Sequence, residues 1–118
     1  AVQESTAPEP DSEFEEDVIQ YLSNKGYECV PQVEEGPFRI DIGIRNPNDS
    51  SQYLLGIECD GASYHSSFLK RAEDLVRQNS LENSGWVIHR IWSSDWFENP
   101  HKEIEKIEEK IDQLKKQN

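Results

Sequence analysis

Residues 38–45, FRIDIGIR, alternate apolar and polar side chains without a break, and no other feature of the chain constrains its fold as strongly. A period of two residues predicts a β-strand with one buried face. The apolar residues of that face are Phe38, Ile40, Ile42 and Ile44. The turn-forming segment NPNDSSQ follows, and residues 53–60, YLLGIECD, resume the alternation. Together the two segments predict a β-hairpin, whose second strand places on one face Tyr53, Leu55, Ile57 and Cys59.

The register expected for this hairpin brings acidic side chains together. If the loop is centred between Asp49 and Ser50, opposing residue numbers sum to 99, and Asp41 then faces Glu58. Asp60 lies two residues beyond Glu58 and shares its face. Like charges placed directly opposite one another destabilise a sheet. The sequence therefore predicts three carboxylates at one end of the hairpin that need a counter-charge.

Two interpretations of this acidic cluster are open. Mg²⁺ prefers oxygen ligands and usually takes one or two carboxylates together with water and substrate phosphate, so a divalent cation is a natural counter-charge. Alternatively, the acids line a solvated sheet face or pair with Arg39 and Arg45. Asp and Glu are depleted in strands, which favours the first interpretation.

The sequence before the hairpin predicts a helix and a strand. Ser12 and Glu15 have the spacing of a capping box, and a helix is expected over residues 13–25, with Gly26 as its C-terminal stop. The segment YECVPQVEE predicts a short strand, which Pro31 directs to a sheet edge or a bulge.

After the hairpin the pattern predicts a helix over residues 67–83, a strand in WVIHRIW, and a final helix that begins at Asn99 and Pro100. The apolar stripe of the first of these helices is Phe68, Leu69, Ala72, Leu75 and Val76. The stripe of the final helix is Ile104, Ile107, Ile111 and Leu114. The expected class is α/β, in the order α-β-β-β-α-β-α.

Length and charge set the remaining bounds. A chain of 118 residues predicts one domain, over 12–118, after an acidic, proline-containing linker or tail at 1–11. No apolar stretch is long enough for a membrane span, and two cysteines make no disulfide framework, so a soluble, cytoplasmic protein is expected. The net charge of −12 argues against nucleic-acid binding. However, residues 1–35 hold ten acids and one base, whereas residues 36–97 hold eight acids and six bases.

Two strings carry a family resemblance: GIECDGASYH, at residues 56–65, and RAEDLVRQNSLENSGWVIHRIWSSDWF, at residues 71–97. With the element order, they resemble the restriction-endonuclease-like, PD-(D/E)XK nuclease fold, in the branch related to very-short-patch-repair endonucleases. Within that branch they resemble the nuclease-like domain at the C-terminal end of large superfamily 1 helicase-like proteins. The resemblance covers about residues 12–100 and implies an αβββαβ core, here with an added C-terminal helix.

The resemblance also implies roles for individual residues. Asp41 and Glu58 match the carboxylates that bind Mg²⁺ or Mn²⁺, and Asp60 stands where many relatives have a catalytic lysine. His65 is a candidate general base or acid, or simply a loop histidine. Glu15 either completes the metal site or only caps its helix.

Other polar residues match the family less specifically. Gln32 stands at a strand position where some members carry a polar active-site residue. Asp74 and Arg77 match an acid and a base that most simply form an ion pair, and Lys70 and Arg71 contact phosphate or are solvated surface charges.

The sequence therefore predicts a metal-dependent DNA endonuclease domain, part of a larger helicase-like chain, with the catalytic set Asp41, Glu58, Asp60 and His65. The alternative is a non-catalytic nucleic-acid-binding or interaction module on the same fold, which the missing lysine and the net acidity favour. A third possibility is that the final helix mediates self-association or docks on the rest of a longer chain. The oligomeric state is left open.

Overall fold

The computed structural model describes residues 12–61 and 68–117, and its elements alternate as the sequence predicts. In chain order they are α1 (Glu13–Asn24), β1 (Cys29–Glu35), β2 (Phe38–Asn46), β3 (Asp49–Asp60), α2 (Phe68–Asn83), β4 (Ile88–Trp92), α3 (Ser93–Glu98) and α4 (Pro100–Lys116). The α/β class and the αβββαβ core with an added C-terminal helix are confirmed. Helix α3 was not predicted. The linker predicted for residues 1–11 lies outside the described residues.

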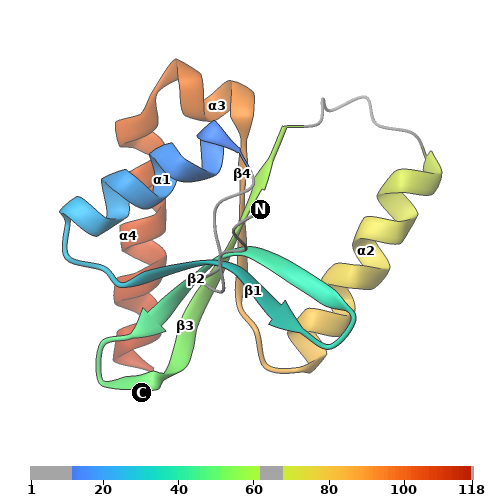
Figure 1. The fold of residues 1–118 in the computed structure, drawn as a ribbon, viewed down its shortest axis with the longest axis horizontal. Helices are drawn as coiled ribbons and strands as arrows, with labels where there is room; N and C mark the ends of the chain where they lie inside the picture. Colours follow the sequence, from blue (N-terminus) through green and yellow to red (C-terminus); the bar gives the residue numbers. More distant parts are fainter. Residues whose placement is uncertain (1–11, 62–67, 118) are drawn as a thin grey trace, which may run out of the picture.

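The four strands form one sheet in the order β1-β2-β3-β4. The first three strands are antiparallel, and β4 joins β3 in parallel. Helices α1, α3 and α4 gather on one side of the sheet, and α2 stands alone on the other (Figure 1). As predicted, Pro31 lies in an edge strand, the position in a sheet where proline is tolerated.

Two apolar clusters cover the two faces of the sheet. The larger joins α1, α4 and the centre of the sheet, and includes Leu22, Ile42, Leu55, Trp96 and Ile107, all nearly inaccessible to solvent. The smaller surrounds Val33, Ile40 and Leu81. The apolar stripe of α4 is buried in the larger cluster, apart from a partly buried Leu114. That stripe is therefore occupied within this chain, which contradicts its use for self-association or external docking.

The hairpin has the predicted register but not the predicted turn. Residue numbers sum to 99 at Ile42↔Ile57 and Ile44↔Leu55. The connection is nevertheless a two-residue turn, because Asn46 pairs with Asp49. Register shifts between residues 44 and 46 account for the difference between the predicted and the observed turn, because such bulges place extra residues on one strand.

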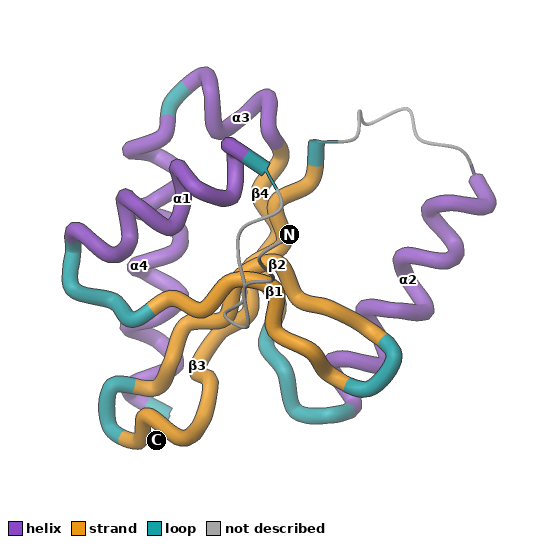
Figure 2. The backbone as a smooth tube through the Cα atoms, viewed as in Figure 1, coloured by secondary structure: helices purple, strands orange, loops and turns teal. Residues whose placement is uncertain are grey.

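These irregularities correct the predicted strand faces. Tyr53 lies in the smaller cluster, because the bulge at Leu54 reverses the alternation and Leu54 packs in the larger cluster instead. Phe38 and Ile40 also pack in the smaller cluster, whereas Ile42 packs in the larger. The buried face of β2 therefore changes between Ile40 and Ile42. At this point the pairing of β2 with β3 ends, while β3 continues beside β4 (Figure 2).

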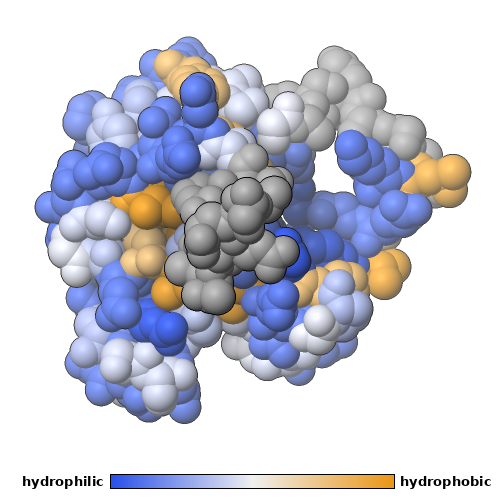
Figure 3. Space-filling view, viewed as in Figure 1, coloured by the Kyte–Doolittle hydropathy of each residue, from blue (hydrophilic) through white to orange (hydrophobic). Residues whose placement is uncertain are grey.

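Helix α2 has the predicted extent but not the predicted buried face. Leu69, Leu75 and Val76, which were expected to form its core stripe, are 73%, 60% and 64% exposed. Figure 3 shows a hollow, surrounded by hydrophilic surface, between α2 and the rest of the molecule. The helix is anchored near its C-terminal end by Leu81, which is buried in the smaller cluster. In the described residues, no helix is both long and apolar enough to cross a membrane.

Candidate active site

Asp41 and Glu58 lie side by side where the β2–β3 ladder ends. The last paired residues are Ile42 and Ile57, and the backbone N–H of Cys59 donates a hydrogen bond to Oδ2 of Asp41 at 2.8 Å. Glu58 is only 5% exposed. Burial, and secondly the neighbouring Asp41 charge, raise the pKa of Glu58 to about 7 despite the opposing effect of Arg77. The predicted convergence of these two acids is therefore observed.

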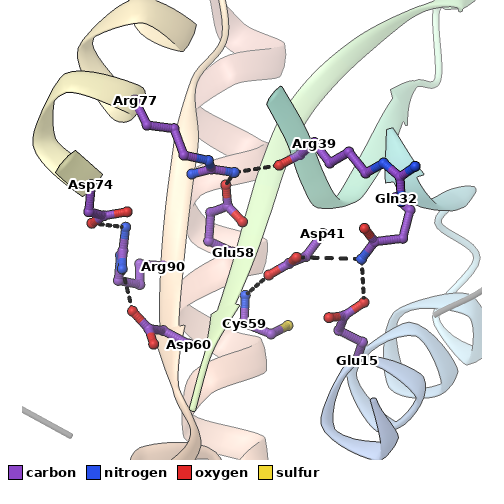
Figure 4. Close-up of polar contacts among 10 residues, drawn as sticks. All are labelled: Glu15, Gln32, Arg39, Asp41, Glu58, Cys59, Asp60, Asp74, Arg77 and Arg90. Atoms are coloured by element: carbon purple, nitrogen blue, oxygen red, sulfur yellow. Dashed lines mark hydrogen bonds and ion pairs between the residues drawn. The ribbon is translucent and has the colours of Figure 1, made fainter. Parts of the chain in front are cut away.

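Two arginines pair with three of the carboxylates of the site, Glu58, Asp60 and Asp74 (Figure 4). Arg77 on α2 donates to Glu58 and to the backbone carbonyl of Arg39. Arg90 on β4 donates to Asp60 and to Asp74, with both distances at 2.5 Å. The ion pair predicted between Asp74 and Arg77 is therefore wrong: each of these residues pairs with a residue of the sheet instead.

A third contact chain reaches the site from α1. The Glu15 N–H donates to the Ser12 hydroxyl, as a capping box requires, but the Glu15 carboxylate is buried and accepts from Nε2 of Gln32 at 2.9 Å. The same Nε2 lies 3.5 Å from Oδ1 of Asp41. Gln32 has a φ of 50°, which is unfavourable for a residue with a side chain. Glu15 thus both caps its helix and belongs to the polar network that ends on Asp41.

A cavity of about 250 Å³ joins these groups. It is lined by Asp41, Glu58, Cys59, Asp60, Asp74, Arg77 and Arg90. All three carboxylates of the predicted cluster border it, so the structure brings Asp41, Glu58 and Asp60 together. His65, the fourth member of the predicted catalytic set, lies outside the described residues.

The donor set fits one kind of cation. Across residues 12–61 and 68–117, no three His, Cys, Asp or Glu side chains form a group that could hold a metal ion. Asp41 and Glu58 therefore offer a two-carboxylate site, and Glu15 is separated from it by Gln32. Two carboxylates are sufficient for Mg²⁺ or Mn²⁺, which complete their coordination with water and substrate phosphate.

Arg90 is the residue of this site that sequence reasoning missed. Its position is set by the parallel β3–β4 pairing, which places it opposite Glu58, and its guanidinium lies 5.6 Å from the centre of the Trp92 ring. The available signal was weak: Arg90 is the only lysine or arginine in WVIHRIW. Lys70 and Arg71 are exposed and do not line the cavity.

Two of the tryptophans have structural contacts. Trp96 is buried in the core, and Trp86 stacks on Tyr53 while its indole N–H donates to Glu35 at 2.8 Å. Trp86 thus packs, partly buried, against the smaller apolar cluster.

The two cysteines are free and partly buried against the larger cluster, as expected of small apolar residues. Burial raises the pKa of Cys29 to about 11 and also raises that of Cys59. These thiols are therefore poorly suited to metal binding or nucleophilic attack.

The comparison with known proteins agrees with the fold. The sequence profile of a restriction endonuclease-like family, REase_MTES_1575, matches residues 14–111, which include both strands of the hairpin and all the residues that line the cavity. No curated protein and no solved structure matches the chain. Because the match spans most of the sequence, this chain belongs to the REase_MTES_1575 family of restriction endonuclease-like domains.

Proposed function

We propose that this chain is a metal-dependent endonuclease domain that hydrolyses phosphodiester bonds of DNA. The observation that carries the proposal is the pair Asp41 and Glu58, which adjacent strands hold together at a cavity although their charges repel. A divalent cation offsets the cost of burying two like charges and binds phosphate at the same time. Membership of a restriction endonuclease-like family supports DNA as the substrate.

Each side chain has a defined part in this proposal. Asp41 and Glu58 hold the cation, which when bound polarises the phosphate and lowers the pKa of an attacking water. The Cys59 N–H and the Gln32 amide fix the two oxygens of Asp41. Asp60 pairs with Arg90 and so positions the guanidinium group of Arg90 at the cavity. His65 is proposed as the general base that takes a proton from the attacking water, or as the general acid that gives one to the leaving oxygen.

We also propose, from the sequence resemblance, that the domain belongs to the very-short-patch-repair-like branch and forms part of a larger helicase-like chain. This proposal is tested by expressing a longer natural chain and assaying both ATP hydrolysis and DNA cleavage. ATP hydrolysis that persists in an Asp41→Asn variant while cleavage stops would support this arrangement. A chain without ATPase activity would reject the helicase link.

The nuclease proposal is tested by incubating plasmid and single-stranded DNA with the purified domain, with EDTA, Mg²⁺ or Mn²⁺. Asp41→Asn and Glu58→Gln are expected to abolish metal-dependent cleavage while circular dichroism shows an unchanged fold. The control is Asp17→Asn, which removes an exposed acid of α1 away from the cavity. Cleavage retained by both active-site variants rejects the assignment.

The second candidate is a non-catalytic nucleic-acid-binding or interaction module, and one observation favours it. Glu58, Asp60 and Asp74 are already paired with arginines, so the chain neutralises much of its own acidic cluster. Titration with Mn²⁺, monitored by electron paramagnetic resonance, separates the candidates. Mn²⁺ binding that Asp41→Asn removes supports the nuclease, whereas DNA binding without any bound Mn²⁺ supports the module.

A further inference from the structure

We infer that Arg77 is the residue that contacts the scissile phosphate, in the role of the lysine that this chain lacks, once a cation has replaced it on Glu58. This inference rests on the proposed nuclease function and deepens it. In the structure Arg77 serves as the counter-charge of Glu58. The guanidinium of Arg77 would therefore occupy the place of the metal first, and would bind the substrate phosphate after the metal has arrived.

The two arginines of the cavity differ in how firmly they are held. Arg90 lies between two carboxylates, Asp60 and Asp74, and over the Trp92 ring, and a cation on Glu58 removes none of these contacts. Arg77, among the described contacts, has a single carboxylate partner, Glu58, and one backbone carbonyl. Only Arg77 loses its counter-charge when the metal binds.

The formal charge of the cavity supports this sequence of events. Its lining contains four carboxylates and two guanidinium groups, which give −2 when all are ionised. A phosphodiester anion is repelled by such a surface, and Arg77 is committed to Glu58. One divalent cation brings the formal charge of the lining to zero. A phosphate oxygen pair is then a suitable new partner for Arg77, because guanidinium binds carboxylate and phosphate in the same bidentate manner.

Arg77 is also placed so that it can change partners. Its side chain is 23% exposed, against 7% for that of Glu58, so it lies on the solvent side of the pair. It projects from α2, whose neighbouring residues Leu75 and Val76 are exposed rather than packed in the core. A change of partner at Arg77 therefore requires no rearrangement of buried apolar side chains.

The test compares Mn²⁺ affinity and DNA cleavage in the Arg77→Gln variant. Without the competing guanidinium, Mn²⁺ is expected to bind about tenfold more tightly, the worth of one charge-assisted hydrogen bond. Cleavage at saturating Mn²⁺ is expected to fall about 100-fold, as when a donor to a developing anion is removed. A merely structural arginine would lower both quantities together, so opposite signs distinguish the two roles.

Two further variants complete the design. Arg77→Lys keeps a cation and is expected to cleave faster than Arg77→Gln, which also keeps the test valid should the glutamine variant fold poorly. Arg45→Gln removes an arginine that pairs with Glu28 at the far end of the hairpin, and should change neither quantity.

Each outcome decides the matter. If the Mn²⁺ affinity of Arg77→Gln is unchanged or lower, Arg77 does not compete with the metal for Glu58. If cleavage is unchanged, Arg77 does not contact the phosphate. A wild-type domain that neither binds Mn²⁺ nor cleaves DNA rejects the proposed function, and the inference with it. If the wild-type domain binds Mn²⁺ and cleaves DNA, and Arg77→Gln changes neither quantity, only the inference about Arg77 is rejected.

Discussion

Glu58→Gln offers a test of the strained acidic pair that needs neither metal nor DNA. Burial and the Asp41 charge raise the pKa of Glu58 to about 7, from an ordinary value of 4.5. Between these two pH values the folded chain keeps the Glu58 proton while the unfolded chain releases it. The folded state then binds more protons, so the contribution of Glu58 to the free energy of unfolding falls as pH rises.

The size of the effect follows from the two pKa values. Linkage gives a slope of about 1.4 kcal/mol per pH unit and a total on the order of 3 kcal/mol between pH 4.5 and 7. Glutamine does not titrate. We therefore expect the stability of Glu58→Gln relative to wild type to rise by this amount over that range, whatever the constant cost of losing the Arg77 pair.

The measurement is urea unfolding in EDTA at several pH values between 4 and 8, followed by tryptophan fluorescence. Asp41→Asn is the matched variant: it removes the second cause of the shift but not the first, which is burial, so it should reduce the pH dependence without abolishing it. A stability difference between Glu58→Gln and wild type that stays constant with pH would refute the reasoning.

Three further substitutions test separate features of the fold and the site. Gln32→Gly relieves a positive φ and should leave the free energy of unfolding in EDTA within about 1 kcal/mol of wild type. The NMR signal of the Cys59 amide should shift, because Asp41 loses its Gln32 contact. An unmoved Cys59 signal would contradict this. Gly43→Ala should cost about 1–3 kcal/mol in urea unfolding, since its Cβ would come within 2.8 Å of Tyr53 and Val33 side-chain atoms; wild-type stability would show that the space exists. Leu75→Gln, on the exposed face of α2, should change the free energy of unfolding by less than about 0.5 kcal/mol, and a loss of several kcal/mol would mean that this face is covered.

The hairpin shows how far sequence reasoning reached. Alternation identified the two strands, although β3 begins at Asp49 and not at Tyr53. The register sum of 99 is correct at Ile42↔Ile57 although the turn lies elsewhere. The two errors, turn position and bulge, compensate one another. Side-chain alternation repeats every two residues, so it specifies parity strongly, whereas the number of residues in a bulge leaves no trace in the pattern.

Helix α2 shows the opposite case. Its apolar residues recur at helical spacing, but Leu69 and Leu75 face solvent, and Leu81 makes the buried anchor. Helical periodicity identifies one face of a helix without identifying what covers it. The ion pairs from Asp74 and Arg77 to the sheet decide how the exposed part of α2 is attached.

The sequence by itself determined the α/β class, the hairpin and the convergence of Asp41 and Glu58, because these depend on local periodicity and on a short connection between neighbouring strands. The tertiary structure alone decided which cations meet those acids. Arg77 and Arg90 reach the site from α2 and β4, 19 residues beyond Glu58 and 30 beyond Asp60, and Gln32 reaches it from the other edge of the sheet. Such partners are selected by packing and by the parallel β3–β4 pairing, which no spacing along the chain encodes.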